Sequence, residues 1–228
     1  MEARFFLHVI IVADGETRPG VALSRALQRE AALVVAADGG ALKAEWLGLS
    51  PQLIVGDGDS LPQTRADALR RAGADVLVHP VAKEESDTEL AVREAVARGA
   101  TSITVLGAFG GARLEHTVAN LLLLTLPALA HVDAELVDGA STVRVIGVAG
   151  PAALEISGAA TDFVSLLPLS ECVEGVTTHG LRYPLSGATL AQGPARGLSN
   201  ELVGSTASVT TRSGRLAVIH TVRSDLPA

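Results

Sequence analysis

The chain has 228 residues, of which 48% are hydrophobic and 19% are charged, so it can build a packed core and is not expected to be disordered. Its formal net charge is −7 and no run rich in lysine and arginine stands out, which argues against non-specific nucleic-acid binding and against a nucleic-acid partner. Cys172 is the only cysteine and cannot form a disulfide within the chain, which fits a reducing cytoplasm.

The first half of the chain alternates short β-rich runs with helix-compatible segments, the pattern of a parallel sheet covered by helices. Residues 5–13 are apolar, but Glu2 stands where a secretory signal would be positively charged, so a first strand is predicted here. The predicted strands are residues 6–12, 33–37, 53–55, 75–78 and 103–106. The predicted helices are residues 18–30, a segment ending near 47, residues 61–71, and residues 86–97 with Ser86 and Glu89 as a capping pair. A Rossmann-like α/β fold is therefore expected.

The most apolar run, residues 118–132, contains Asn120, Pro127 and His131 and is too short to span a bilayer. We interpret it as a buried helix and expect no membrane partner. Beyond it the helical period fades, and short strand candidates are separated by Gly, Ser and Pro. These candidates are residues 134–137, 142–146, 154–156, 163–167, 208–211 and 216–221. The pattern predicts an antiparallel β-sandwich or barrel, with a domain boundary near residue 138.

Acidic residues and glycines recur where the predicted parallel strands end. These strand ends are Asp14-Gly15, Asp38-Gly39-Gly40, Asp57-Gly58-Asp59 and Gly110-Gly111. A parallel sheet would bring them to one rim, where open α/β folds bind ligands. Turn formation explains each one singly, but it does not explain why several carry carboxylates. Asp57 and Asp59 are two hard oxygen ligands one residue apart, a pair that suits Mg²⁺ beside substrate phosphates.

Two further clusters at helix starts could complete a phosphate site. Residues 83–89 offer Asp87 as a third carboxylate and Lys83 as a charge for phosphate, although an acid-rich, solvated helix start is the simpler alternative. Residues 107–116 offer free glycine N–H groups and Arg113 for anions. The alternative for this second cluster is a strand-to-helix turn whose polar side chains face water.

A fourth cluster lies in the second half of the chain. Tyr183, the only tyrosine, precedes Ser199 and Asn200, and an aromatic plane beside hydrogen-bonding groups suits a flat heteroaromatic ligand. A proline-containing hairpin with a surface tyrosine is the alternative. No G-x-x-x-x-G-K-[ST] loop and no complete dinucleotide loop is present, so phosphate binding would need another arrangement.

Taken in order, these clusters resemble the thiamine pyrophosphokinase (thiamine diphosphokinase) family. The resemblance rests on Asp38-Gly39-Gly40, Gly56-Asp57-Gly58-Asp59-Ser60, Lys83-Glu84-Glu85-Ser86-Asp87, Arg113-Leu114-Glu115-His116 with Asn120, and Gly197-Leu198-Ser199-Asn200. The sequence departs from the family pattern at Gly58, where a bulky residue is frequent, at Glu84, Ser86 and Glu115, and at Ala112, which looks inserted.

The resemblance implies a homodimeric enzyme that transfers diphosphate from ATP to the hydroxyethyl group of thiamine, releasing AMP, with the active site between subunits. Residues 1–138 would form the catalytic domain that binds ATP and Mg²⁺, and residues 139–228 the thiamine-binding domain. Asp57, Asp59 and Asp87 would be catalytic and would ligate Mg²⁺. The residues implied for ATP are Asp38, Gly39, Lys83, Gly110, Gly111, Arg113, His116 and Asn120, and those implied for thiamine are Tyr183, Ser199 and Asn200. The alternatives are a pyrophosphokinase acting on a pterin and a non-catalytic nucleotide- or vitamin-binding protein.

Overall fold

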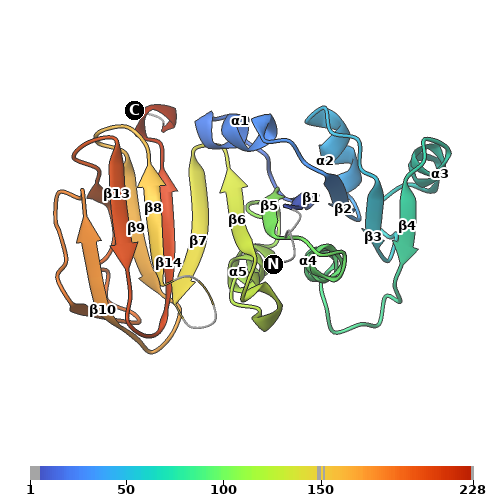
Figure 1. Cartoon of the computed structure of the whole chain (residues 1–228). Coiled ribbons are helices and arrows are strands. Elements are labelled where there is room, and N and C mark those ends of the chain that lie inside the picture. The colour runs from blue at the N-terminus through green and yellow to red at the C-terminus, as the bar shows by residue number, and fades with distance from the viewer. Residues whose placement is uncertain (1–5, 148–149, 151, 227–228) are drawn as a thin grey trace.

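The computed structural model describes residues 6–147, 150 and 152–226, which form two sheets and their covering helices (Figure 1). The larger sheet has ten strands in the order β12-β9-β14-β7-β6-β5-β1-β2-β3-β4. Its strands are β1 (His8–Val12), β2 (Leu33–Ala37), β3 (Leu53–Gly56), β4 (Asp75–Val78), β5 (Ser102–Leu106), β6 (Asp133–Asp138), β7 (Ser141–Gly147), β9 (Phe163–Pro168), β12 (Asn200–Glu201) and β14 (Arg215–Thr221). The smaller sheet has the order β11-β10-β13-β8, with β8 (Ala153–Ser157), β10 (Cys172–His179), β11 (Ala188–Ala191) and β13 (Thr206–Thr210).

Helices cover both faces of the parallel part of the large sheet. The helical elements are α1 (Val21–Gln28), α2 (Gly40–Trp46), α3 (Gln63–Arg71), α4 (Asp87–Ala97), α5 (Leu114–Leu123) and two 3₁₀ turns, η1 (Pro127–Leu129) and η2 (Arg223–Asp225). Buried side chains of α1, α2 and α3 pack on one face, and those of α4 pack on the other, together with the residues that follow α5. The predicted Rossmann-like half is therefore confirmed.

Strand β1 pairs in parallel with both β2 and β5. The chain runs outward from β1 through β2, β3 and β4, and then returns to the other side of β1 with β5 and β6. This reversal of strand order opens a crevice at the carboxyl ends of β1 and β5, the position where open α/β sheets bind ligands. The topology thus marks the rim between β1 and β5 before any side chain is considered.

The second half of the chain continues the same sheet. Strand β6 is parallel to β5 but antiparallel to β7, with Leu136 opposite Val143, so the sheet passes without a break through the turn near the predicted boundary. The four-stranded sheet then packs on the antiparallel part, and their shared core includes Leu166 and Val218 of one sheet and Val176 and Val209 of the other. This arrangement is the predicted antiparallel sandwich.

One local prediction is wrong, and three strands were not predicted. Residues 118–132 are not one buried helix, because α5 ends at Leu123, Pro127 opens η1, and Val118 and Leu122 are 50% and 48% exposed. The sequence also did not predict β10, β11 and β12. Within the described ranges, no helix is both long and apolar enough to cross a membrane.

A buried carboxylate joins α1 to both halves of the sheet. Glu135 on β6 is 5% exposed, and its Oε1 accepts a hydrogen bond from Arg29 Nη1 at 2.6 Å. Its Oε2 accepts from Arg144 Nη2 on β7 at 2.5 Å, and the Thr104 hydroxyl donates to Oε1 at 2.9 Å. Both carboxylate oxygens are therefore paired, as a buried charge requires.

Candidate active site

A cavity of about 360 Å³ opens at the carboxyl ends of the parallel strands, where the topology places a ligand crevice. Nine residues predicted from the sequence line it: Asp38, Gly39, Lys83, Asp87, Gly110, Gly111, Arg113, His116 and Asn120. Its volume lies within the range of small-molecule sites. The separate clusters of the first half therefore meet in one place.

Three carboxylates converge beside this cavity. Oxygen atoms of Asp38, Asp57 and Asp59 lie within 4.8 Å of one another. Asp38 ends β2 in the left-handed region, at φ 42°, and is 4% exposed. Gly56 is required next to it, because a Cβ at position 56 would lie 2.7 Å from the Asp38 Cβ. The oxygen-only donor set suits Mg²⁺.

Hydrogen bonds within the Asp57–Ser60 turn fix these carboxylates. The Ser60 N–H donates to Asp38 Oδ2 at 2.9 Å, the Asp59 N–H donates to Asp57 Oδ1 at 3.2 Å, and the Ser60 hydroxyl donates to Asp59 Oδ1 at 2.8 Å. Gly58 has a φ of 79°, and a Cβ there would meet nothing within 4 Å. Glycine serves the backbone conformation at this position, since the space around it is open.

The environment separates the pKa values of two of the three carboxyls. Burial raises the pKa of Asp38, and the hydrogen bond from the Ser60 N–H opposes this rise without cancelling it. The hydrogen bond from the Ser60 hydroxyl lowers the pKa of the exposed Asp59 carboxyl, and its contact with Asp38 lowers that pKa further. The pKa values of neighbouring carboxyls separate because a second negative charge beside the first is unfavourable.

Lys83 links this turn to the start of α4. Its Nζ donates to Asp87 Oδ1 at 2.5 Å and to Asp57 Oδ2 at 3.4 Å, and its side chain is only 12% exposed. Burial alone would lower the pKa of Lys83, but the two carboxylates outweigh it and raise the pKa, so the ammonium is charged at neutral pH. Of the predicted metal ligands, Asp57 and Asp59 share the carboxylate cluster, whereas Asp87 is held by Lys83.

The glycine-rich turn before α5 forms the opposite wall. Buried Asn120 donates to the Ala108 carbonyl at 2.7 Å, so this amide holds the turn in place. Arg113 is 69% exposed and donates to Glu115 at 2.7 Å, so a phosphate would have to draw the guanidinium away from that carboxylate. Glu115, one of the positions where the sequence departs from the family pattern, is therefore the ion-pair partner of Arg113.

The second-half residues lie elsewhere. Asn200 on β12 accepts from the Tyr183 N–H at 3.0 Å and donates to the Tyr183 carbonyl at 2.8 Å. Tyr183 itself is 63% exposed. The Ser199 N–H donates to the Ser165 hydroxyl at 3.0 Å. β12 is an edge strand of the large sheet, eight strands from β3 in the strand order, a separation of roughly 38 Å along the sheet at ~4.8 Å per strand. One copy of the chain does not bring Tyr183 to the carboxylates.

Some lining residues were not predicted as part of the site. Asp14, Ser60 and Thr88 also line the cavity. Asp14 lies two residues beyond the end of β1, and its carboxyl carbon would lie 2.8 Å from a Cβ at position 39. The signal for Asp14 was in the sequence, because it heads one of the repeated Asp-Gly strand ends.

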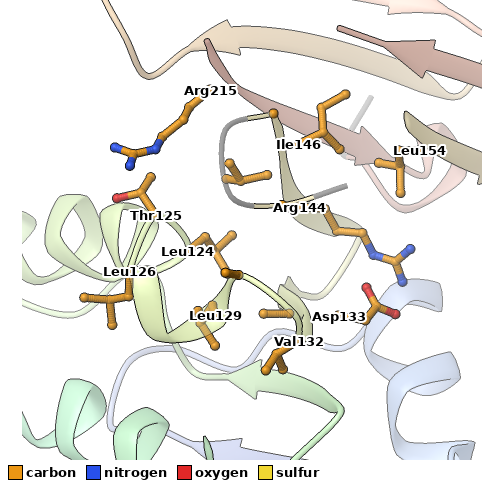
Figure 2. A pocket seen from close by; sticks show the side chains of 15 residues that line it. Leu124, Thr125, Leu126, Leu129, Val132, Asp133, Arg144, Ile146, Leu154 and Arg215 are labelled. Atoms are coloured by element: carbon orange, nitrogen blue, oxygen red, sulfur yellow. The ribbon is translucent and has the colours of Figure 1, made fainter. Parts of the chain in front are cut away.

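A second pocket is mainly apolar and has a volume of about 50 Å³. Figure 2 shows Leu124 and Leu129, from the segment after α5, on one side of this pocket and Ile146 and Leu154 of the sandwich half on the other. It is far smaller than ordinary small-molecule sites and contains none of the predicted site residues. We interpret it as a packing gap between the two halves.

Fold and rim together define an α/β protein with a ligand crevice at the carboxyl ends of its parallel strands, continued into an antiparallel β half. Family comparisons give the particular family. The catalytic-domain model of thiamin pyrophosphokinase matches residues 24–136, and the vitamin B1 binding domain model of the same enzyme matches residues 154–216. The chain belongs to the thiamin pyrophosphokinase family, as its motifs predicted.

Relatives of known structure span nearly the whole chain. The thiamin pyrophosphokinase of Geobacillus thermodenitrificans is 30% identical, with a TM-score of 0.79 over 96% of this chain and 100% of that one. The yeast enzyme is 15% identical, with a TM-score of 0.78 over 98% of this chain and 89% of that one, which shows a shared fold. A curated thiamine pyrophosphokinase of Bacillus subtilis is 25% identical over 173 residues, covering 75% of this chain and 79% of the relative.

Proposed function

We propose that this chain is an enzyme that uses Mg²⁺ and transfers diphosphate from ATP to the hydroxyethyl group of thiamine, producing thiamine diphosphate and AMP. The observation that carries the proposal is the group of Asp38, Asp57 and Asp59 oxygens beside a cavity lined by Lys83 and Arg113, in a member of this family. A cluster of carboxylates needs a divalent cation beside it to accept a polyphosphate. The oxygen-only donor set fits Mg²⁺.

The proposed reaction is an in-line displacement. The thiamine hydroxyl oxygen forms a bond to the β-phosphorus, the bond from that phosphorus to the oxygen it shares with the α-phosphorus breaks, and AMP leaves with that oxygen. The hydroxyl proton passes to a carboxylate of the site. Asp57 and Asp59 would hold Mg²⁺ together with Asp38 or Asp87, and the bound ion would neutralise charge on the phosphate oxygens.

The remaining residues position the polyphosphate. Lys83 and Arg113 would bind phosphate oxygens, Gly110 and Gly111 would let the backbone approach them closely, and His116 lines the same cavity. Such transfers depend on positioning and charge neutralisation more than on covalent catalysis. Tyr183, Ser199 and Asn200 are proposed to bind thiamine.

An AMP assay tests the proposal and separates it from its rivals. The purified chain with Mg²⁺ and ATP should release AMP only when thiamine is added. AMP release that depends on a hydroxymethyl pterin would indicate a pterin pyrophosphokinase. The absence of AMP with either acceptor, despite nucleotide binding, would indicate a non-catalytic binding protein.

Two features support a homodimer whose active site lies between subunits. The proposed thiamine residues are eight strands from the carboxylates within one chain, so a second copy would have to supply them. In addition, α5 starts at the cavity and exposes Leu114, Val118 and Leu122 at a spacing of four residues, which places them on one helix face. An exposed apolar stripe of this kind suits a protein partner.

Mixing two inactive variants would test the shared site. Asp57→Asn damages only the carboxylate half and Tyr183→Ala only the proposed thiamine half, so a mixed dimer would contain one intact site of two. With random pairing, half of the dimers are mixed, and we expect activity to recover to about a quarter of the wild-type value. The assay is thiamine-dependent AMP release after co-refolding at limiting thiamine. Activity that stays at the sum of the two variants would contradict a shared site.

A cytoplasmic location is proposed as well. The single Cys172 is exposed, a situation suited to a reducing compartment.

A further inference from the structure

Lys83 lies between two carboxylates of the rim, Asp57 and Asp87. Its ammonium contacts Asp57, in the turn after β3, at 3.4 Å and Asp87 of α4 at 2.5 Å. The side chains of Lys83, Asp57 and Asp87 are 12%, 11% and 27% exposed. Among the described residues, no other ion pair involves either carboxylate. Lys83 therefore binds one oxygen of each of two carboxylates that the sequence predicts as metal ligands.

Lysine is rare in this chain, so its presence at position 83 is informative. Of its 18 basic residues only Lys43 and Lys83 are lysines, and the other 16 are arginines. Both partners of buried Glu135, Arg29 and Arg144, are arginines. Arginine holds carboxylates in a rigid fork, whereas lysine is a compact charge on a flexible stem that can move between acceptors.

We propose that Lys83 is a placeholder cation, meaning a charge that holds Asp57 and Asp87 until Mg²⁺ and a polyphosphate arrive together. When they bind, the ammonium moves from the carboxylates to the phosphate oxygens and releases Asp87 to the metal. This inference rests on the proposed function, because it assumes a metal–polyphosphate site. It also accounts for the difference between the predicted ligand set, which includes Asp87, and the observed cluster, which includes Asp38.

The placeholder has a consequence that a simple phosphate-binding lysine does not have. A divalent ion without nucleotide must displace an ammonium from two carboxylates, so the free ion should bind weakly to the wild-type protein. Removal of the ammonium should therefore strengthen binding of the free ion and weaken binding of the polyphosphate. If Lys83 acted only on phosphate, its removal would change free-ion binding only by the small effect of one unit charge, which salt screens.

Mn²⁺ is the probe for the test, because its free and bound forms are distinguished by electron paramagnetic resonance. We expect Lys83→Met to bind Mn²⁺ at least about tenfold more tightly than wild type in the absence of nucleotide. Lys43→Met is the matched control, since Lys43 lies on α2 and does not line the cavity, and it should bind Mn²⁺ like wild type. Lys83→Met binding that equals or falls below that of wild type would overturn the proposal.

A second variant keeps the test decisive if Lys83→Met fails to fold in a thermal melt. Lys83→Arg retains the charge in a form that grips carboxylates more firmly, so it should bind Mn²⁺ more weakly than wild type. Unchanged or tighter binding by Lys83→Arg would count against the placeholder. Failure of the proposed function has a different signature, because the wild-type chain would then release no AMP with thiamine, whatever the Mn²⁺ affinities.

Discussion

Replacement of Asp57 by asparagine is expected to lower thiamine-dependent AMP formation by at least about a hundredfold, or ~2.7 kcal/mol of transition-state stabilisation. Asparagine keeps the shape of the side chain and one oxygen but removes the negative charge that would hold Mg²⁺. Asp57 also anchors the turn, because its Oδ1 accepts the Asp59 N–H. The amide oxygen can still accept this bond, so the loss should reflect charge rather than folding. The measurement is kcat/KM for thiamine at saturating Mg²⁺ and ATP.

The matched control for this variant is Asp67→Asn. Asp67 lies on α3, is 52% exposed and pairs with Arg70, so the same chemical change there should leave activity within about twofold of wild type. The two variants should have similar melting temperatures. A loss of less than about tenfold in Asp57→Asn would rule out the proposed metal-binding role.

Removal of the Glu135 carboxylate is expected to cost more stability than removal of an exposed ion-paired carboxylate of the β-strands. Glu135→Ala leaves the Arg29 and Arg144 guanidiniums without their shared partner and leaves a gap in a site that is 5% exposed. Breaking a buried pair usually costs 3–5 kcal/mol, and because both arginines are about one-third exposed we expect about 3 kcal/mol. Urea unfolding followed by circular dichroism would measure the change in free energy of unfolding.

Glu174→Ala serves as the comparison for Glu135→Ala. Glu174 on β10 pairs with Arg212 but is 46% exposed, so its removal should cost under about 1 kcal/mol. Glu135→Gln should fall between the two, because the amide keeps the volume and part of the hydrogen bonding. If Glu135→Ala and Glu174→Ala had equal effects, burial would not be the cause of the stability that Glu135 provides.

The α/β half could be predicted because its strands and helices follow simple rules. The apolar run that ends in Gly56 became the fully buried β3, and Ser86 caps α4 by accepting the Glu89 N–H at 3.2 Å. The reciprocal bond of a capping box is absent, since the Glu89 carboxylate accepts from Arg93 instead. Local pattern was sufficient wherever the residues that stabilise an element are neighbours in sequence.

The elements that were predicted wrongly or not at all do not follow these local patterns. Strand β10 contains Gly175 at φ 67° and shifts register between Val173 and Val176, so its sequence lacks regular alternation. The apolar residues of α5 look like core in the sequence, which does not reveal whether a stripe faces the same chain or the surface.

The carboxylate cluster depends on pairing between strands. Asp38 reaches Asp57 and Asp59 because β2 and β3 align with Ala37 opposite Val55, which puts the two strand ends side by side. This register is a property of three-dimensional pairing and cannot be read from either segment alone. The sequence therefore predicted acidic residues at this rim but not that Asp38 lies beside Asp57 and Asp59. The assignment of Asp87 as a metal ligand stays a prediction.

The unbroken passage from β6 into β7 limits how the molecule can move. A hydrogen-bonded hairpin has no flexible linker to act as a hinge, and Glu135 locks its two strands to α1. Rocking of one half against the other would break the hydrogen bonds between β6 and β7 and separate Glu135 from its arginine partners. Opening and closing around substrates is therefore expected to occur as movement between the subunits of the proposed dimer or as movement of the loop that carries Lys83. The continuous sheet would stay rigid between the two ends of each chain.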